Sequence, residues 1–274
     1  MEEGGKMKKV VISCSVFYKE LLDLTGDEQI TIEFLPQGLH DIPDCSKMKD
    51  QIQAKIDQVE AQKDYDYIIL AYGFCSGGVE GLQTEKASLV VPIVHDCIPL
   101  LLGQKDIKDD LDSNRTFYLS RGWIDCSGDT YKHYLAMTDQ IEQWIDRFEQ
   151  YQKEDEDALV EWPDLDQYNI IRSYDQDTAE YISYQCLKGY QMIALIDNDK
   201  LAPIHYQYAQ QMHNFIEDIL IRNGGQKLDY KEVEGSLEFL KKLLYFDQLD
   251  KTEREELFLI TPSKKPLQLE KYII

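Results

Sequence analysis

Three cysteines and one histidine in the first hundred residues are the side chains that could carry chemistry together. Cys14 ends one apolar run, Cys75 lies in a glycine-rich turn after another, and His95 and Cys97 directly follow a third. Thiolate and imidazole groups together suit zinc, iron–sulfur centres or another soft transition metal. We therefore predict a metal or cluster site formed by Cys14, Cys75, His95 and Cys97.

Asp96 lies between two of these candidate ligands. A carboxylate in that position could orient the His95 imidazole, as residues that support metal ligands commonly do. We assign His95 and Asp96 as candidate catalytic residues, with His95 either a fourth ligand or a nearby acid or base. The His95–Cys97 spacing is not a usual zinc spacing, and the chain has no Cys-x-x-Cys motif.

Glycines surround Cys75 on both sides. Their backbone N–H groups can approach an anion or a cofactor closely, so Gly73, Gly77 and Gly78 are candidate cofactor-binding residues. Trp123, further along the chain, is a fourth candidate because it could line a pocket. The other interpretation is a sharp turn that needs positive φ angles. The spacing matches neither the P-loop nor the G-x-G-x-x-G fingerprint.

Two other interpretations of the same residues stay open. In the first, His95 deprotonates Cys75 or Cys97, which then acts as the nucleophile of an enzyme without a metal. The segment Gly-Phe-Cys-Ser-Gly around Cys75 loosely resembles the Gly-x-Ser-x-Gly nucleophile elbow. In the second, the thiols are packing groups of a non-catalytic partner protein, since cysteine is among the most buried residue types.

These residues need a scaffold that brings distant segments together, and the apolar pattern predicts one. Strands alternating with helices favour a parallel, doubly wound sheet with right-handed crossovers. Ligands of such sheets bind beyond the carboxyl ends of the strands, near the point where strand order reverses. If the first, third and fourth strands are neighbours, as in a flavodoxin-like order, the candidate residues converge there. The expected strands in this half are residues 9–14, 30–35, 67–72, 88–94 and 115–120.

The alternation of strands and helices is interrupted once and then resumes. We expect an N-terminal α/β lobe at residues 1–128 that carries the Cys/His site, a helical middle at 129–189 and a C-terminal βα lobe at 190–274. The expected fold class is α/β, a Rossmann-like parallel sheet with flanking helices, either as one lobe or bilobal with a second, smaller α/β lobe. The pattern is compatible with one sheet or two. The later strands are expected at residues 191–197, 227–233 and 257–261.

The composition narrows the classes of partner. The 274 residues include 51 acidic and 29 basic side chains, for a formal net charge of −22. Such a surface repels phosphate backbones, so nucleic acid is not an expected partner. No apolar run reaches the ~20 residues that span a bilayer, and the first residues lack the pattern of a signal peptide. We expect a cytoplasmic protein without a membrane partner, whose six cysteines are thiols or ligands.

Several of these segments together resemble a known family. The chain is similar to the uncharacterised prokaryotic domain-of-unknown-function family numbered sixteen thirty-eight, and the resemblance covers most of its length. The Tyr-Gly-x-Cys segment ending at Cys75 and the His-Asp-Cys segment ending at Cys97 are its most specific motifs. The last strand departs from the family, because Ile-Thr-Pro-Ser at 260–263 stands where Val-Pro-Pro-Gly is usual. The other segments that carry the resemblance are Cys14, 37–40, 81–82, 101–103, 122–124 and 237–244.

The resemblance implies a metabolic context but no particular activity. Members of the family occur largely in anaerobes, often beside corrinoid-dependent methyl-transfer proteins. This implies a role in metal, iron–sulfur or corrinoid handling in one-carbon metabolism, with corrinoid or methyltransferase proteins as expected partners. The residues carried over are Cys14, Cys75, His95 and Cys97. The corrinoid-binding Asp-x-His-x-x-Gly pattern is absent, so no histidine of this chain is expected to ligate cobalamin.

Overall fold

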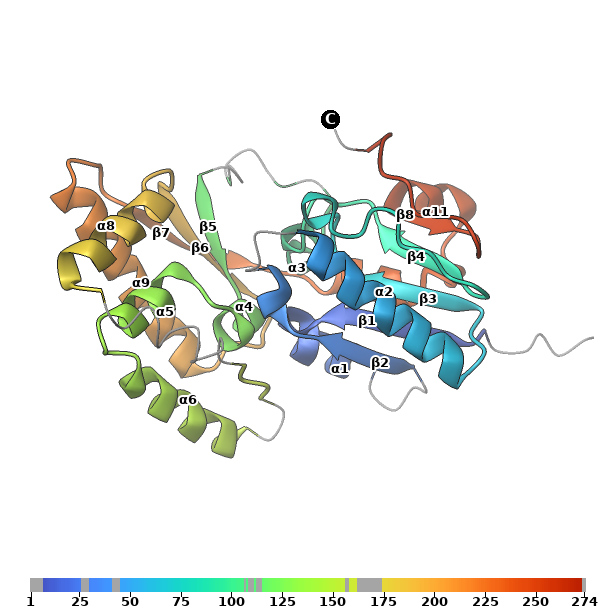
Figure 1. The fold of residues 1–274 in the computed structure, drawn as a ribbon, viewed down its shortest axis with the longest axis horizontal. Helices are drawn as coiled ribbons and strands as arrows, with labels where there is room; N and C mark the ends of the chain where they lie inside the picture. Colours follow the sequence, from blue (N-terminus) through green and yellow to red (C-terminus); the bar gives the residue numbers. More distant parts are fainter. Residues whose placement is uncertain are drawn as a thin grey trace, which may run out of the picture. The chain divides into compact units, whose positions relative to one another are not determined.

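The computed structural model describes residues 7–25, 30–40, 45–105, 107, 111, 115–155, 158–161 and 174–272. They fall into two compact units, each with its own sheet (Figure 1). Unit 1 comprises Met1–Asp106 and Ser236–Ile274, and unit 2 comprises Ile107–Gly235. Part of the predicted helical middle, residues 156–157 and 162–173, lies outside the described residues. Among the described helices, none is both long enough and apolar enough for a membrane span.

Unit 1 contains a five-stranded sheet in the order β2-β1-β3-β4-β8. Most side chains of β1, β3 and β4 are buried, which accounts for the nearly continuous apolar runs of their sequences. Four strands are parallel, and β8 pairs antiparallel with β4 at the edge. The strands are β1 (Lys9–Cys14), β2 (Thr31–Leu35), β3 (Tyr67–Ala71), β4 (Ser88–Pro92) and β8 (Phe258–Thr261).

The order of these strands reverses between β1 and β3. The chain passes from β1 through α1 (Tyr18–Thr25) to β2, and then through α2 (Cys45–Gln62) back past β1 to β3. Because parallel crossovers are right-handed, this reversal sends α1 and α2 to opposite faces of the sheet. Figure 1 shows α2 crossing in front of the strands. The first, third and fourth strands are therefore neighbours, which is the condition for the candidate residues to converge.

The remaining elements of unit 1 are short. Helix α10 packs against α3 and β3, which joins the late segment of the chain to the early one. Lys9 strengthens the same junction, because its ammonium group donates to the Leu244 carbonyl at 2.9 Å and to the Asp247 carboxylate at 2.8 Å. These elements are η1 (Ser15–Phe17), η2 (Gln37–His40), η3 (Cys75–Gly77), α3 (Ile98–Leu102), α10 (Glu238–Leu244), η4 (Phe246–Gln248) and α11 (Lys251–Leu257).

Unit 2 has a three-stranded parallel sheet in the order β5-β6-β7. Its core is rich in aromatic rings, with Trp144, Phe148 and Tyr208 packed against one another. The elements are β5 (Thr116–Leu119), α4 (Arg121–Cys126), α5 (Thr130–Met137), α6 (Glu142–Glu154), α8 (Gln176–Leu187), β6 (Met192–Asp197), α9 (Pro203–Arg222) and β7 (Asp229–Glu234).

One lysine lies inside the core of unit 2. Lys132 is only 1% exposed, and its ammonium group donates to the carbonyls of Ile124 at 2.5 Å and Ser127 at 2.7 Å. Its nitrogen also lies 5.8 Å and 5.6 Å from the ring centres of Phe148 and Tyr208. The carbonyls at the end of a helix have no partner within the helix, and Lys132 supplies one for the end of α4. Lys132 thereby helps to fix the position of α4.

The α/β class, with parallel strands flanked by helices, is confirmed, and the strands form two sheets. The units divide the chain at 106/107 and 235/236, whereas the sequence pattern placed boundaries at 128/129 and 189/190. Strand pairing explains the difference. β5 pairs with β6 rather than with β4, and β8 returns to β4 after unit 2 is complete.

The loops after β3 and β4 are packed directly against each other. The N–H groups of Phe74 and Cys75 donate to the carbonyls of Val94 at 2.9 Å and His95 at 3.0 Å. A Cβ atom on Gly73 would lie 2.5 Å from the backbone of Asp96. Gly73 is therefore required for the close approach of the two loops.

Replacing Gly73 by alanine is expected to lower the free energy of unfolding by roughly 1–3 kcal/mol, because the added methyl group forces the two loops apart. Gly38→Ala is the matched control, since no atom lies within 4 Å of the position its Cβ would take. Chemical denaturation of both variants measures the difference. Equal stability of the two would contradict this packing.

Candidate functional site

The predicted residues of unit 1 lie at one edge of its sheet, in different environments. Cys14 ends β1 and is buried, and Cys97 follows β4 and is buried as well. Cys75, just after β3, is partly exposed, whereas the His95 side chain is 86% exposed. Since β1, β3 and β4 are parallel neighbours, all four residues follow the carboxyl ends of adjacent strands. Cys14 and Cys75 flank the point where strand order reverses.

Cys75 lies in a turn of unusual backbone conformation. The φ angles of Cys75, Ser76 and Gly77 are 45°, 55° and 88°, so three successive residues are in the left-handed region. That conformation costs free energy at the two residues that are not glycine. Hydrogen bonds hold the turn, because the N–H groups of Gly77 and Gly78 donate to the carbonyls of Phe74 at 2.9 Å and Cys75 at 3.0 Å. The thiol of Cys75 therefore projects from a fixed backbone.

Backbone conformation or close packing explains why positions in this turn are glycine. Gly77 has a positive φ, and a Cβ on Gly78 would lie 2.9 Å from the sulfur of Met48. These positions match the interpretation as a sharp turn. The assignment of Gly73, Gly77 and Gly78 to a cofactor stays a prediction.

Asp96 makes its closest contact with the backbone. Its Oδ1 accepts the Ile98 N–H at 2.8 Å, at the start of α3. Its Oδ2 lies 3.8 Å from Nδ1 of His95, which is beyond hydrogen-bond distance. The carboxylate thus serves first to begin a helix, and the catalytic roles of His95 and Asp96 stay predictions.

The positions of these residues do not test the predicted metal site either. In the part of the chain that the structure describes, no group of three or more His, Cys, Asp and Glu side chains is placed to hold a metal ion. None of the described cysteines Cys14, Cys75, Cys97, Cys126 and Cys186 forms a disulfide. The predicted set of Cys14, Cys75, His95 and Cys97 stays a prediction.

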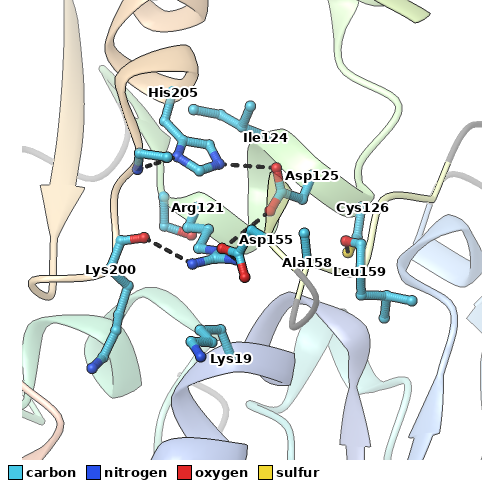
Figure 2. Close-up of polar contacts among 12 residues, drawn as sticks. Lys19, Arg121, Ile124, Asp125, Cys126, Asp155, Ala158, Leu159, Lys200 and His205 are labelled. Atoms are coloured by element: carbon cyan, nitrogen blue, oxygen red, sulfur yellow. Dashed lines mark hydrogen bonds and ion pairs between the residues drawn. The ribbon is translucent and has the colours of Figure 1, made fainter. Parts of the chain in front are cut away.

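A second cluster, which the sequence did not predict, lies at the carboxyl edge of the sheet of unit 2 (Figure 2). Arg121 begins α4 after β5, Asp125 follows one turn later, and His205 lies in the first turn of α9 after β6. All three are buried. One carboxylate oxygen of Asp125 is 3.0 Å from Nε2 of His205, and the other is 3.4 Å from Nε of Arg121.

The hydrogen bonds of His205 assign its tautomer. The Ala202 N–H donates to Nδ1 at 2.7 Å, so Nδ1 carries no proton, and Nε2–H donates to Asp125. The imidazole is therefore neutral. The local sequence favours this arrangement, because Pro203 begins α9 and a side chain at the third helical position can bond back to the preceding backbone N–H.

Arg121 completes the cluster through three contacts. Besides Asp125, its guanidinium reaches the Asp155 carboxylate at 2.9 Å and the Lys200 carbonyl at 3.1 Å. Burial opposes the charge of Arg121, but Tyr151, Asp125 and Asp155 outweigh it and raise the pKa of Arg121. Burial, followed by the nearby Asp125 charge, raises the pKa of Tyr151. The cluster holds α4 and α9 together, and each of its ionised groups has an opposite charge beside it.

Only part of this second cluster has a local pattern in the sequence. Arg121 and Asp125 are four residues apart, which is the spacing of an ion pair on one helix face. His205 contacts Asp125 across 80 positions of sequence, and no local pattern indicates that contact. The cysteine of this helix, Cys126, is buried and donates to the Leu159 carbonyl at 3.3 Å.

Trp123 and Asp197 lie at the same edge of unit 2. The Trp123 side chain is partly buried, and its indole N–H has no hydrogen-bond partner among the described residues. Its role in binding a cofactor stays a prediction. Asp197, at the end of β6, accepts the Tyr206 hydroxyl at 2.7 Å, and this hydrogen bond raises the pKa of Tyr206 to about 12.

His205→Leu is expected to lower the free energy of unfolding by roughly 2–4 kcal/mol, because it leaves the Ala202 N–H and the buried Asp125 carboxylate each without one partner. His205→Gln should cost less, since an amide side chain can both accept and donate at this position. Denaturation curves of the two variants provide the comparison. If both variants lose the same stability, the hydrogen bonds of His205 are not what holds this edge.

One family model matches the chain, over residues 34–244, which is more than half of it. The family is described as protein of unknown function DUF1638. The matched range includes the turn at Cys75, the His-Asp-Cys segment that begins at His95 and all the residues of the second cluster. Comparisons with curated proteins and with solved structures found no match. The chain therefore belongs to the family of proteins of unknown function DUF1638.

Proposed function

We propose that this protein is an enzyme that carries out thiol chemistry at the carboxyl edge of the sheet of unit 1, with Cys75 as the reacting group. The observation that carries the proposal is the left-handed turn that holds Cys75. Strained backbone at residues other than glycine is concentrated at functional sites, because surrounding contacts must maintain it. Here the hydrogen bond from Cys75 to the His95 carbonyl is one of those contacts.

Accessibility favours Cys75 over the two neighbouring thiols. Cys14 and Cys97 are buried, whereas Cys75 is partly exposed just beyond β3. A nucleophile must be reached by its substrate, and ligands of parallel sheets approach from this edge. The substrate class we infer is a small electrophile that fits at the point where strand order reverses.

The chemistry that we propose is attack by the Cys75 thiolate on an electrophilic carbon of this substrate. The thiol proton passes to a base, and the sulfur forms a bond to carbon as the leaving group departs. His95 is the candidate base, since it belongs to the loop that contacts Cys75 through the backbone. Its imidazole is exposed, and it can exchange protons with water.

In the protein without substrate, Cys75 is expected to react with iodoacetamide about tenfold faster than Cys186, because a nucleophilic cysteine is activated beyond what exposure alone provides. Cys186 is the matched control, since it is exposed on α8. Mass mapping of labelled peptides at short times gives both rates, and Cys75→Ser identifies the fast thiol. Labelling of Cys186 at the same rate as Cys75, or faster, would contradict the proposal.

A second candidate function is metal or iron–sulfur binding, which the positions of Cys14, Cys75 and Cys97 after three adjacent strands favour. Thiolates brought to one sheet edge are ligands of soft metals. The setting of corrinoid and one-carbon metabolism, with corrinoid or methyltransferase proteins as partners, belongs to this candidate. It rests on the resemblance described above.

Protein purified without oxygen separates the two candidates. Metal binding predicts near-stoichiometric metal by elemental analysis, with visible absorption if the centre is iron–sulfur, and loss of that metal in Cys75→Ser and in Cys97→Ser. Cys186→Ser should retain it. Colourless protein without metal, or full retention of metal in both ligand variants, would exclude this candidate.

A further inference from the structure

The loop after β6 contains a buried amide whose hydrogen-bonding capacity is unused. Asn198 is only 9% exposed, and neither its Oδ1 nor its Nδ2 has a hydrogen-bond partner in the described part of the chain. Buried polar groups are nearly always paired, because an unpaired one loses its water without compensation. An amide with both atoms unpaired therefore indicates that another molecule forms hydrogen bonds with it in the functional protein.

Three other polar groups of this loop have hydrogen-bond partners. The Asp197 carboxylate accepts from Tyr206 and, at 2.8 Å, from the backbone N–H of Asp199. The Lys200 carbonyl accepts from Arg121, and the Ala202 N–H donates to a histidine nitrogen. Asn198 is thus not needed to hold the loop in place. The hydrogen-bonding capacity of its side chain is therefore left unused by the loop.

Gly235 makes room for this amide. It follows β7, which is the parallel neighbour of β6, and its N–H donates to the Asp197 carbonyl at 2.8 Å. A Cβ atom at position 235 would lie 1.7 Å from Oδ1 of Asn198. The amide therefore occupies space directly beside the Gly235 backbone, beyond the carboxyl ends of two parallel strands. Ligands of parallel sheets bind at this edge.

A second unpaired group lies at the same edge. Trp123 is on α4, after β5, and its indole Nε1 is buried without a hydrogen-bond partner among the described residues. β5 is the other parallel neighbour of β6. The edge of unit 2 thus offers one amide, with an acceptor and a donor, and one further donor.

We propose that Asn198 binds a small planar ligand that presents a hydrogen-bond donor next to an acceptor, as a primary carboxamide or a nucleobase edge does. The amide of asparagine has one acceptor oxygen and one donor nitrogen, which match such an edge with two parallel hydrogen bonds. Trp123 adds a donor for a further acceptor of the ligand. This site belongs to unit 2 alone and does not depend on the chemistry proposed for Cys75.

The test measures binding of nicotinamide and of adenosine to the full chain by titration calorimetry and by the shift in Tm. Purine riboside is the control ligand, because it lacks the exocyclic amine of adenosine and therefore the donor. At least one of the two complementary probes is expected to bind, and Asn198→Leu should weaken that binding about tenfold or more. If adenosine binds, purine riboside should be weaker by a similar factor. Asn214→Leu, an exposed asparagine on α9, should bind as the unmodified chain does.

Gly235→Ala provides an independent variant, since its methyl group would displace the amide without changing Asn198 itself. It should lose the same binding while circular dichroism shows a folded chain. Binding retained in both Asn198→Leu and Gly235→Ala would overturn the proposal. So would failure of both nicotinamide and adenosine to bind at millimolar concentration, because the amide would then be satisfied by ordered water only.

Discussion

The two backbone hydrogen bonds from Phe74 and Cys75 to Val94 and His95 are the interaction on which the candidate site of unit 1 depends. They continue the pairing of β3 and β4 beyond the last residues of both strands. Gly73 permits this approach, since no side chain fits between it and Asp96. The strained turn at Cys75 can persist because the neighbouring loop holds it, and these contacts fix the position of the thiol that we propose as the reacting group.

Unit 2 fixes the corresponding edge of its sheet by a different means. A buried ion pair and a hydrogen bond join the helix that follows β5 to the helix that follows β6, through Arg121, Asp125 and His205. Burying charged groups is costly unless each is paired, and here each carboxylate contact is matched by a cation or a neutral donor. Lys132 satisfies the other end of α4. Asn198 lies at this same edge, and its amide makes no hydrogen bond among the described residues.

The sequence allowed the class of fold and the strand-end positions of the thiols to be predicted, because apolar runs and turn residues are local signals. The flavodoxin-like neighbourhood of the first, third and fourth strands was only assumed as the condition for the candidate residues to converge, and the strand order meets that condition. The return of β8 to β4 could not be predicted, since pairing partners so distant in sequence leave no local pattern. The same holds for His205 and Asp125. The direction of individual side chains could not be predicted from the sequence either. It determines that His95 points to solvent while Cys14 and Cys97 are buried.

Unit 1 is built from two chain segments that flank unit 2 in the sequence, and this has a consequence for folding during synthesis. Domains generally fold as units, from the N-terminus onward, as the ribosome releases them. All of unit 2 emerges before β8 exists, so β4 keeps an unpaired edge during that time. The N–H of Gly81, in the loop that contains Cys75, donates to the carbonyl of Leu267, a residue made after all of unit 2. The loop that holds the proposed nucleophile therefore reaches its final form only after unit 2 has been made, so the candidate site of unit 1 is completed later than unit 2.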